Sequence, residues 1–429
     1  MIVTQYKMLV NSCYTSLGDE MTVTAIICEY NPFHFGHAYQ IKMAREITQA
    51  DFIVVVMSGN FVQRGEPAIV NKWTRAEMAL LGGVDLVLEL PVPFATSSAA
   101  YFAHGAAQLL DATGVVDYLC FGSELGSIEP LQEIAKILLE ETPSYKSSLK
   151  ENLAVGLSYP AARANALPAA YREIVNAPNN ILGIEYIKAL TALNSKIKPV
   201  TVKRIGAGYN ETTLSTAFAS ATSIRNSILE TKGFQSISSH VSEATYALLM
   251  REISEGRGPV SQRAMFESLR YKIRSTENAL LANYPGITEG LEARMRKAFA
   301  QATTFEEAVA AIATKRYPRT RIARSLLAIY LGIDCNMLDC FIDSGPTYVR
   351  VLGMKESAST LLKAMNNSTT LEISMKLKPL VSHKQESISA LARTEMLSTD
   401  LYVLLYPAQS SFKHAGQEFL NNPIIVSKS

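Results

Sequence analysis

The chain contains apolar runs of strand length with few polar residues, among them 52-FIVVVM-57 and 116-VDYLCF-121. Strands that face water on one side alternate apolar with polar residues, whereas near-continuous apolar strands are typical of a parallel sheet covered on both faces. Helical patterns separate these runs, and short connections between strand and helix favour right-handed crossovers. The chain is therefore expected to fold as an α/β protein with a doubly wound parallel sheet.

The predicted elements divide the chain into two parts. Strands are predicted at 22–29, 52–57, 84–90, 116–121 and 199–204, with helices near 38–49, 74–82, 98–112, 128–141 and 181–193. Later segments are mostly helical, at 241–255, 262–274, 289–300, 304–314 and 320–331, with weak strand patterns near 347–353 and 400–405. We therefore predict an N-terminal extension at 1–20, an α/β domain at 21–232 and a mostly helical domain at 233–429.

Composition excludes several classes of protein. The 429 residues include five cysteines without a CxxC pair, so neither a disulfide framework nor a structural metal is indicated. No apolar run reaches the roughly 18–20 residues that span a bilayer, so no membrane association is expected. Residues 1–20 lack the arrangement of a signal peptide, which makes the cytoplasm the expected location. The net charge of +2 indicates no partner by itself.

A turn and two histidines follow the first predicted strand, in 30-YNPFHFGH-37. Pro32 fixes the bend, and His34 and His37 lie on either side of Gly36, where a helix begins. A helix N-terminus attracts phosphate, and glycine lets a nucleotide approach the backbone. Two imidazolium groups there would stabilise charge that develops on a phosphate during in-line displacement. The alternatives are incidental loop histidines or metal ligands, but the position between strand and helix favours a nucleotide site.

A second segment, 219-ASATSIRNSIL-229, has the residues of a phosphate cradle. Ser220 and Thr222 stand where a helix begins, and Arg225 follows within its first turns. Hydroxyls, helix N–H groups and a guanidinium suit the β- and γ-phosphates of ATP. The alternative is an ordinary serine or threonine cap with a solvated arginine.

Together these motifs resemble those of the HxGH nucleotidylyltransferase superfamily. Longer runs resemble the tRNA(Met) cytidine acetate ligase family, and this match covers nearly the whole chain from Met21 onward. The runs are 26-IICEYNPFHFGH-37, 64-RGEPAIVNKWTRAEMALLGGVDLVLELP-91, 121-FGSE-124, 178-PNNILGIEY-186 and 315-KRYPRTRIAR-324. The resemblance implies a nucleotidylyltransferase-like ATP-binding catalytic domain at 21–232 and a tRNA-binding domain at 233–429.

The family resemblance also implies a reaction and a site. Acetate would attack the α-phosphate of ATP, and N4 of the wobble cytidine of elongator tRNA(Met) would then take the acetyl group. Mg²⁺ is expected to accompany ATP, without a protein ligand set. The implied catalytic residues are His34, His37 and Arg225. The implied ATP contacts are Ile27, Cys28, Glu29, Tyr30, Asn31, Pro32, Phe33, His34, Gly36, His37, Gly122, Asn179 or Asn180, Arg204, Ser220 and Thr222. In one departure, Ala221 stands where common superfamily forms have a second serine.

Basic residues gather in the second half of the chain. Clustered Arg and Lys neutralise phosphates, and an aromatic ring among them can stack on an unpaired base. The alternative is a solvated basic helix face. The predicted tRNA contacts are Lys315, Arg316, Tyr317, Arg319, Arg321 and Arg324, with further basic groups at 262–274 and 294–297.

Three questions stay open at this point. The acetate pocket has only candidates, which are Lys72, Trp73, Arg75 and His104. The alternatives are core packing for Trp73, a solvated helix residue for Arg75 and a satisfied helical side chain for His104. The group that deprotonates cytidine N4 and the oligomeric state are not indicated. The rival function is a metabolic nucleotidylyltransferase that transfers AMP to a small phosphorylated substrate, and a non-enzymatic tRNA-binding protein is a third alternative.

Overall fold

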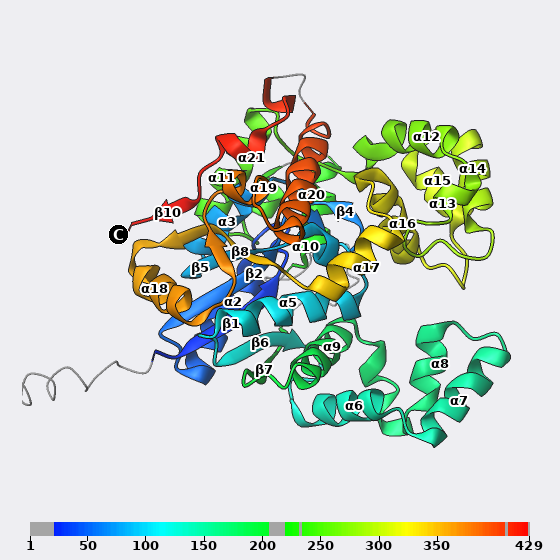
Figure 1. The fold of residues 1–429 in the computed structure, drawn as a ribbon, viewed down its shortest axis with the longest axis horizontal. Helices are drawn as coiled ribbons and strands as arrows, with labels where there is room; N and C mark the ends of the chain where they lie inside the picture. Colours follow the sequence, from blue (N-terminus) through cyan, green and yellow to red (C-terminus); the bar gives the residue numbers. More distant parts are fainter. Residues whose placement is uncertain (1–20, 206–218, 231–233, 408–410, 428–429) are drawn as a thin grey trace, which may run out of the picture.

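A computed structural model describes residues 21–205, 219–230, 234–407 and 411–427. Over these residues the core is an eight-stranded sheet in the order β10-β8-β5-β2-β1-β6-β7, with β9 paired to β8 (Figure 1). Strands β5, β2, β1, β6 and β7 run parallel to one another, whereas β8 is antiparallel to β5. The predicted doubly wound α/β fold is therefore confirmed. The strands are β1 (Val23–Cys28), β2 (Phe52–Ser58), β5 (Leu86–Leu90), β6 (Tyr118–Ser123), β7 (Lys198–Lys203), β8 (Tyr348–Lys355), β9 (Glu372–Ser374) and β10 (Ile424–Val426).

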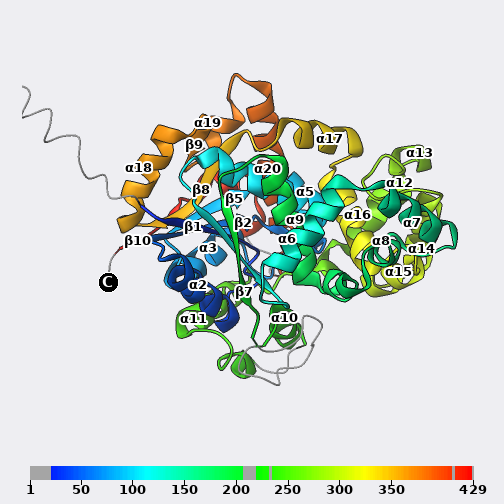
Figure 2. The ribbon, with the colours of Figure 1, turned by 90° about the horizontal axis from the view of Figure 1, so that it is seen from below.

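Alternate residues of each central strand enter two different hydrophobic cores. In β2, Val54 and Val56 face one core, and Ile53, Val55 and Met57 face the other. The first core is closed by α4 (Val92–Ala95), α5 (Ala99–Thr113), α6 (Glu129–Glu140) and α9 (Pro178–Ala192). The second is closed by α2 (Phe35–Thr48), α3 (Lys72–Leu81), α10 (Ala221–Leu229) and α11 (Glu243–Ser254), and Figure 2 shows the helices on both faces. Burial on both faces explains why these strands have no polar alternation.

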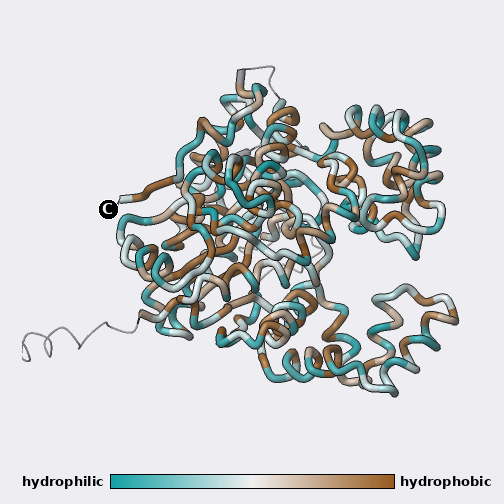
Figure 3. The backbone as a smooth tube through the Cα atoms, viewed as in Figure 1, coloured by the Kyte–Doolittle hydropathy of each residue, from teal (hydrophilic) through white to brown (hydrophobic). Residues whose placement is uncertain are grey.

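Two groups of helices extend beyond the sheet (Figure 1). One consists of α7 (Pro143–Ala154) and α8 (Tyr159–Ala166), which follow α6. The other, which we call the helical lobe, has its own hydrophobic core, built on residues such as Phe299 and Leu326. Brown segments run through the interior of this lobe in Figure 3. Its helices are α12 (Phe266–Ser275), α13 (Asn278–Leu281), α14 (Leu291–Gln301), α15 (Phe305–Ile312) and α16 (Arg319–Leu331).

After the lobe, the chain returns to the sheet. It forms α17 (Cys335–Ser344), β8, α18 (Ser359–Ser368), β9, α19 (Leu377–Val381), α20 (Glu386–Val403), α21 (Gln417–Leu420) and β10. The strand expected near 347–353 is confirmed as β8, but the one expected near 400–405 is wrong, because α20 continues to Val403. Strands β8, β9 and β10 thus place part of segment 233–429 in the sheet of segment 21–232. The division into an ATP-binding and a tRNA-binding domain stays a prediction about function.

A buried ionic cluster fixes this returning segment to the sheet. Lys72 is fully buried, and its ammonium pairs with Glu89 at 2.6 Å and with Glu418 of α21. Thr399 of α20 donates to Glu418 at 2.7 Å, and Arg350 of β8 lies 3.5 Å from the same carboxylate. Buried ions are stable only when paired in this way. The charges therefore join elements that are more than 300 residues apart in the chain.

In the described part of the chain, no single helix combines the length and the apolar composition of a membrane span. Helices α16 and α17 reach that length and apolar composition only when they are taken together, and the chain bends by 94° between them.

Candidate active site

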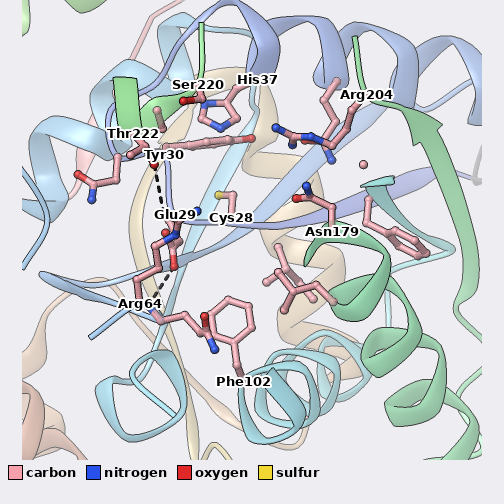
Figure 4. A pocket seen from close by; sticks show the side chains of 18 of the residues that line it. Cys28, Glu29, Tyr30, His37, Arg64, Phe102, Asn179, Arg204, Ser220 and Thr222 are labelled. Carbon is pink, nitrogen blue, oxygen red and sulfur yellow. Dashed lines mark hydrogen bonds between the residues drawn. The ribbon is translucent and has the colours of Figure 1, made fainter. Parts of the chain in front are cut away.

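A cavity opens at the carboxyl ends of the parallel strands, beside the point where the strand order reverses. The chain runs outward from β1 through β2 to β5, then crosses to the other side of β1 to form β6. Open α/β sheets bind ligands at such switch points. The cavity is lined by residues that follow β1, by the end of β6, by α9 and by the start of α10 (Figure 4).

The two histidines cap helix α2 with their side chains. Nδ1 of His34, the N-cap, accepts from the N–H of Gly36 at 3.0 Å, and Nδ1 of His37 accepts from the N–H of His34 at 3.3 Å. The rings are stacked, with centroids 3.7 Å apart. Because each Nδ1 is an acceptor, each neutral ring has its proton on Nε2. The paired Nε2–H groups are therefore the donors that remain for a ligand.

Burial keeps both imidazoles neutral in the ligand-free protein. His34 is 7% exposed, and desolvation together with the Arg204 and Arg225 guanidiniums lowers its pKa to about 3. Desolvation, His34 and Arg204 likewise place the pKa of His37 well below its usual value. Without an anion beside them the rings act as neutral donors, and the imidazolium pair expected beside an α-phosphate stays a prediction. A bound phosphate anion would shift both pKa values upward.

Gly36 is required for a reason that sequence reasoning did not give. A Cβ at this position would lie 2.9 Å from Cε1 and 3.1 Å from Nδ1 of the His34 ring. A side chain would displace the ring from its capping position. The glycine thus serves the geometry of the histidine pair, and it also lines the adjoining cavity.

Helix α10 brings its N-terminus beside the histidine pair (Figure 4). Ser220 is the N-cap and accepts from the N–H of Ser223 at 3.1 Å. Arg225 donates to the carbonyl of Asn31 at 2.8 Å and forms an ion pair with Glu66 at 2.9 Å. The structure therefore brings the two predicted phosphate-binding segments together, although 194 residues separate Asn31 from Arg225.

A third wall comes from the loop after β6 and the start of α9. Glu124 accepts from the backbone N–H of Asn179 at 3.2 Å and of Asn180 at 2.9 Å, and from the Asn179 side chain at 2.5 Å. Asn180 in return accepts from the N–H groups of Glu124 and Leu125. Asn179 lines the cavity, whereas Asn180 is buried and holds the loop. Nearby, the aliphatic part of Arg204 lies 3.2 Å from where a Cβ on Gly122 would be.

Most of the predicted ATP contacts line this cavity or its extension toward α2. Pro32, Phe33 and Asn180 line neither part. Phe33 instead packs edge-on against Tyr30, with ring centroids 5.0 Å apart. The predicted residues that do line it are Ile27, Cys28, Glu29, Tyr30, Asn31, His34, Gly36, His37, Gly122, Asn179, Arg204, Ser220, Thr222 and Arg225.

Several lining residues were missed by sequence reasoning. Gln63 and Arg64 lie between β3 (Phe61–Val62) and β4 (Glu66–Pro67), a hairpin just after β2. Arg64 reaches across the cavity and donates to the Thr222 hydroxyl at 3.2 Å. The signal that could have identified them is their position after a central parallel strand. The other missed residues include Gln40 and an apolar wall of Phe102, Phe121, Leu182 and Tyr186.

The acetate candidates lie elsewhere. Lys72 belongs to the buried ionic cluster, and Arg75, also fully buried, donates to the backbone carbonyls of Glu29 and Ser58. Neither they nor Trp73 and His104 line the cavity. None of the four is therefore placed to hold acetate in this cavity, and Arg75 instead holds the end of β1 in place.

The basic segment of the helical lobe is only partly available to a ligand. Tyr317 is 9% exposed, its hydroxyl donates to the Thr288 carbonyl, and Arg321 covers its ring at 4.9 Å. The expected stacking of Tyr317 on an RNA base is therefore wrong. Arg316 is exposed but pairs with Glu289, whereas Lys315 and Arg319 are exposed and Arg324 is half-buried.

Arginines in the other basic groups cap helix ends. Arg274 donates to the carbonyl of Phe299, Arg294 to that of Ala311, and Arg296 to that of Arg274. Their charge remains, but their guanidiniums satisfy backbone acceptors at the ends of helices. Sequence alone cannot distinguish these arginines from arginines that face solvent.

The fold and this cavity define an ATP-binding protein of the nucleotidyltransferase class. The chain matches the family described as HIGH Nucleotidyl Transferase over residues 21–418. Relatives named tRNA(Met) cytidine acetate ligase include one from Acetivibrio thermocellus, 43% identical over 95% of this chain and 100% of its own. Another, from Caldanaerobacter subterraneus subsp. tengcongensis, is 44% identical over 90% of this chain and 96% of its own.

Solved structures agree with these relatives. Thermotoga maritima TmcAL bound with alpha-thio ATP has a TM-score of 0.88 to this chain at 35% identity, covering 95% of this chain and 100% of its own. The apo form of the same protein has a TM-score of 0.90 at 36% identity, with the same coverage. The chain belongs to the tRNA(Met) cytidine acetate ligase family.

Proposed function

We propose that this protein activates acetate with ATP and transfers the acetyl group to N4 of the wobble cytidine of elongator tRNA(Met), which forms N4-acetylcytidine. The observation that carries the proposal is the meeting of two donor sets in one cavity. The Nε2–H groups of the stacked histidines and the N-terminus of α10 with Arg225 line neighbouring parts of it. The family relationship supplies the identity of the substrates.

In the first step, acetate oxygen attacks the α-phosphorus of ATP and pyrophosphate leaves. Acetate is ionised at neutral pH, because carboxylic acids have pKa values near ~4, so this step needs no general base. It needs alignment and stabilisation of charge on the phosphate oxygens. His34 and His37 would donate to the α-phosphate, and Arg225 and the α10 N–H groups would hold the leaving pyrophosphate.

Magnesium would be held mainly by the phosphates. The cavity offers one carboxylate, Glu29, and no group of three or more His, Cys, Asp or Glu side chains within the described ranges could hold a metal. Oxygen ligands from the triphosphate and water suit Mg²⁺, which keeps much of its water shell. The residues present therefore fit a nucleotide-borne ion.

The tRNA would approach along a groove beside the ATP cavity. This groove lies between the start of α5 and helix α16, and Tyr101, Arg321 and Arg324 line it. Tyr101 is 42% exposed and precedes Phe102, which lines the ATP cavity. Arg324 has no acidic partner among the described residues. Desolvation lowers the pKa of its guanidinium, and the neighbouring Arg321 lowers that pKa further. A cation without an acidic partner among the described residues, in a groove beside the ATP cavity, suits an RNA phosphate.

Close backbone packing fixes this groove to the ATP site. Gly65 follows Arg64, has a φ of 81°, and approaches α16 so closely that a Cβ would lie 2.4 Å from the backbone nitrogen of Arg324. The loop that reaches into the ATP cavity and the helix that lines the groove are therefore packed directly together.

Purified protein should be incubated with ATP and labelled acetate, with and without tRNA. We expect acetate-dependent exchange of pyrophosphate into ATP, and label in tRNA nucleosides as N4-acetylcytidine. Exchange that depends on a nucleotide-like cosubstrate, with no label in tRNA, would instead support the rival nucleotidylyltransferase. Retention of tRNA without any exchange would indicate a binding protein.

A further inference from the structure

The second step of the proposed reaction requires a proton acceptor. Cytidine N4 carries two protons and is a weak nucleophile, and its nitrogen becomes acidic once it has added to the acetyl carbonyl. The acceptor must lie in the cavity where acetyl-adenylate forms, within hydrogen-bond reach of the amine. This inference rests on the proposed function, because it concerns the fate of that proton.

Among the described residues that line the cavity, few can accept a proton at neutral pH. Arg64, Arg204 and Arg225 are cations, and burial raises the pKa values of Cys28 and Tyr30, so both stay protonated. His37 binds a proton poorly, since its pKa is well below the usual value, and its Nδ1 accepts a backbone N–H. Tyr186 is a phenol, which is protonated at neutral pH, so the titratable group that remains among the described lining residues is a carboxylate.

That carboxylate belongs to Glu29, the residue that follows β1 (Figure 4). Its position is fixed at both ends. The backbone carbonyl accepts from Arg75 at 2.6 Å, and Oε1 accepts from the N–H of Gln63 at 2.9 Å. No hydrogen bond from another described residue reaches Oε2, and the side chain is half-buried in the cavity wall.

Glu29 is poorly suited to bind ATP through its side chain. A carboxylate repels phosphate and acetate oxygens, so the ATP contact that the family resemblance implies for it is better assigned to its backbone. The apolar wall of Phe102, Phe121, Leu182 and Tyr186 belongs to the same cavity and could stack on a planar base. The cavity thus combines a flat apolar wall with one carboxylate, which suits an aromatic amine.

We propose that Oε2 of Glu29 takes the proton from N4 of cytidine during acetyl transfer. N4 attacks the acetyl carbonyl carbon, and the N–C bond forms as the carbonyl electrons move to oxygen. The N4 proton passes to Glu29, and collapse of the adduct breaks the bond between the acetyl carbon and the phosphate oxygen. AMP leaves with that electron pair, and Glu29 returns its proton to solvent, so charges and atoms balance.

The charges around Glu29 suit this role. Desolvation raises the pKa of its carboxyl and Glu66 adds to the rise, whereas Arg64, the N–H of Gln63 and Arg225 oppose it. The guanidinium of Arg75, on α3, also interacts electrostatically with the Glu29 carboxylate. A carboxylate whose pKa lies above the usual value is a stronger base than an exposed one, while it can still be ionised at neutral pH.

The test separates the two half-reactions. Acetyl-adenylate is formed on the enzyme with ATP, acetate and pyrophosphatase, tRNA is added, and transfer is followed in a single turnover. For Glu29→Gln we expect transfer to fall at least about a hundredfold, within the range for loss of a general base, while pyrophosphate exchange falls less than about tenfold. Glu29→Asp, which keeps a carboxylate, should restore part of the transfer rate.

The control is Glu66→Gln, which removes the neighbouring carboxylate that pairs with Arg225. Because Arg225 holds pyrophosphate in the first step, this variant should change exchange more than transfer, which is the opposite of the pattern expected for Glu29→Gln. The wild-type transfer rate should also fall as pH drops through the pKa of Glu29, and the Glu29→Gln rate should lack this fall.

Two results would overturn the assignment of Glu29. Full-rate transfer by Glu29→Gln would mean that the leaving phosphate or water takes the proton. Equal losses in exchange and transfer would mean that Glu29 serves ATP binding or the loop. A wild-type protein that forms acetyl-adenylate but never acetylates tRNA would refute the proposed function itself, which is a different outcome.

Discussion

Acidification should destabilise the ligand-free protein through the buried histidine pair. In the folded chain the pKa of His34 is lowered to about 3, whereas the usual value is 6.5. Between these values the unfolded chain binds more protons than the folded one, so stability is complete above pH 6.5 and is lost progressively as pH falls toward 3. At pH 5.0 the gap of about 1.5 units corresponds to about 2 kcal/mol for His34 alone. The lowered pKa of His37 acts in the same direction.

Urea denaturation followed by circular dichroism at pH 7.5 and pH 5.0 measures this loss. The informative variant is His34→Asn, because asparagine is a good N-cap and can accept the Gly36 N–H without titrating. We expect wild type to lose about 2 kcal/mol more than this variant on acidification. That is a large part of a typical stability of about 5–15 kcal/mol.

The matched control is His414→Asn at an exposed histidine, which should lose as much as wild type. Equal losses in wild type and His34→Asn would refute the reasoning. In that case the imidazole would already be charged, or solvated, in the folded protein.

Three further variants test other parts of the structure. His37→Ala should abolish acetate-dependent pyrophosphate exchange and leave tRNA retention on a filter within about twofold, and lost retention would make the histidine pair structural. Arg324→Gln should weaken tRNA binding and reduce by about one the slope of log affinity against log salt concentration. Arg316→Gln should change both quantities less, because Arg316 is already paired with Glu289, and the reverse order would contradict tRNA binding in the groove. Gly65→Ala should slow acetyl transfer. It should also lower the free energy of unfolding by more than the ~1–2 kcal/mol of left-handed strain, because the added methyl group meets α16. Gly156→Ala has similar strain in open space and should show the cost of the strain alone.

Sequence reasoning predicted the part of the fold that depends on local pattern. Apolar runs, three of them near-continuous, identified the five parallel strands, and helical periods identified the helices between them. The location of the cavity followed from the rule that ligands bind at carboxyl ends of strands, and HFGH and SATSIR marked two of its walls. All of these features depend on residues that are close together in the sequence.

The remaining features depend on contacts between distant residues. Strand β8 joins β5 across about 260 residues and runs antiparallel to it, and nothing within either strand specifies that pairing. The neutral histidines result from burial by elements that the sequence does not place together. Tyr317 is covered by a turn around Thr288, so an apparent RNA-stacking ring became part of the lobe core.

The central claim is that the histidine pair holds the α-phosphate of ATP, while helix α10 holds the pyrophosphate beside it. A crystal structure with a non-hydrolysable acetyl-adenylate analogue measures this most directly. We expect the group that replaces the α-phosphate to lie within hydrogen-bond distance of Nε2 of His37, between α2 and α10, with the acetyl group toward Glu29. An analogue bound in the Arg324 groove, or with this group away from both helices, would contradict the claim.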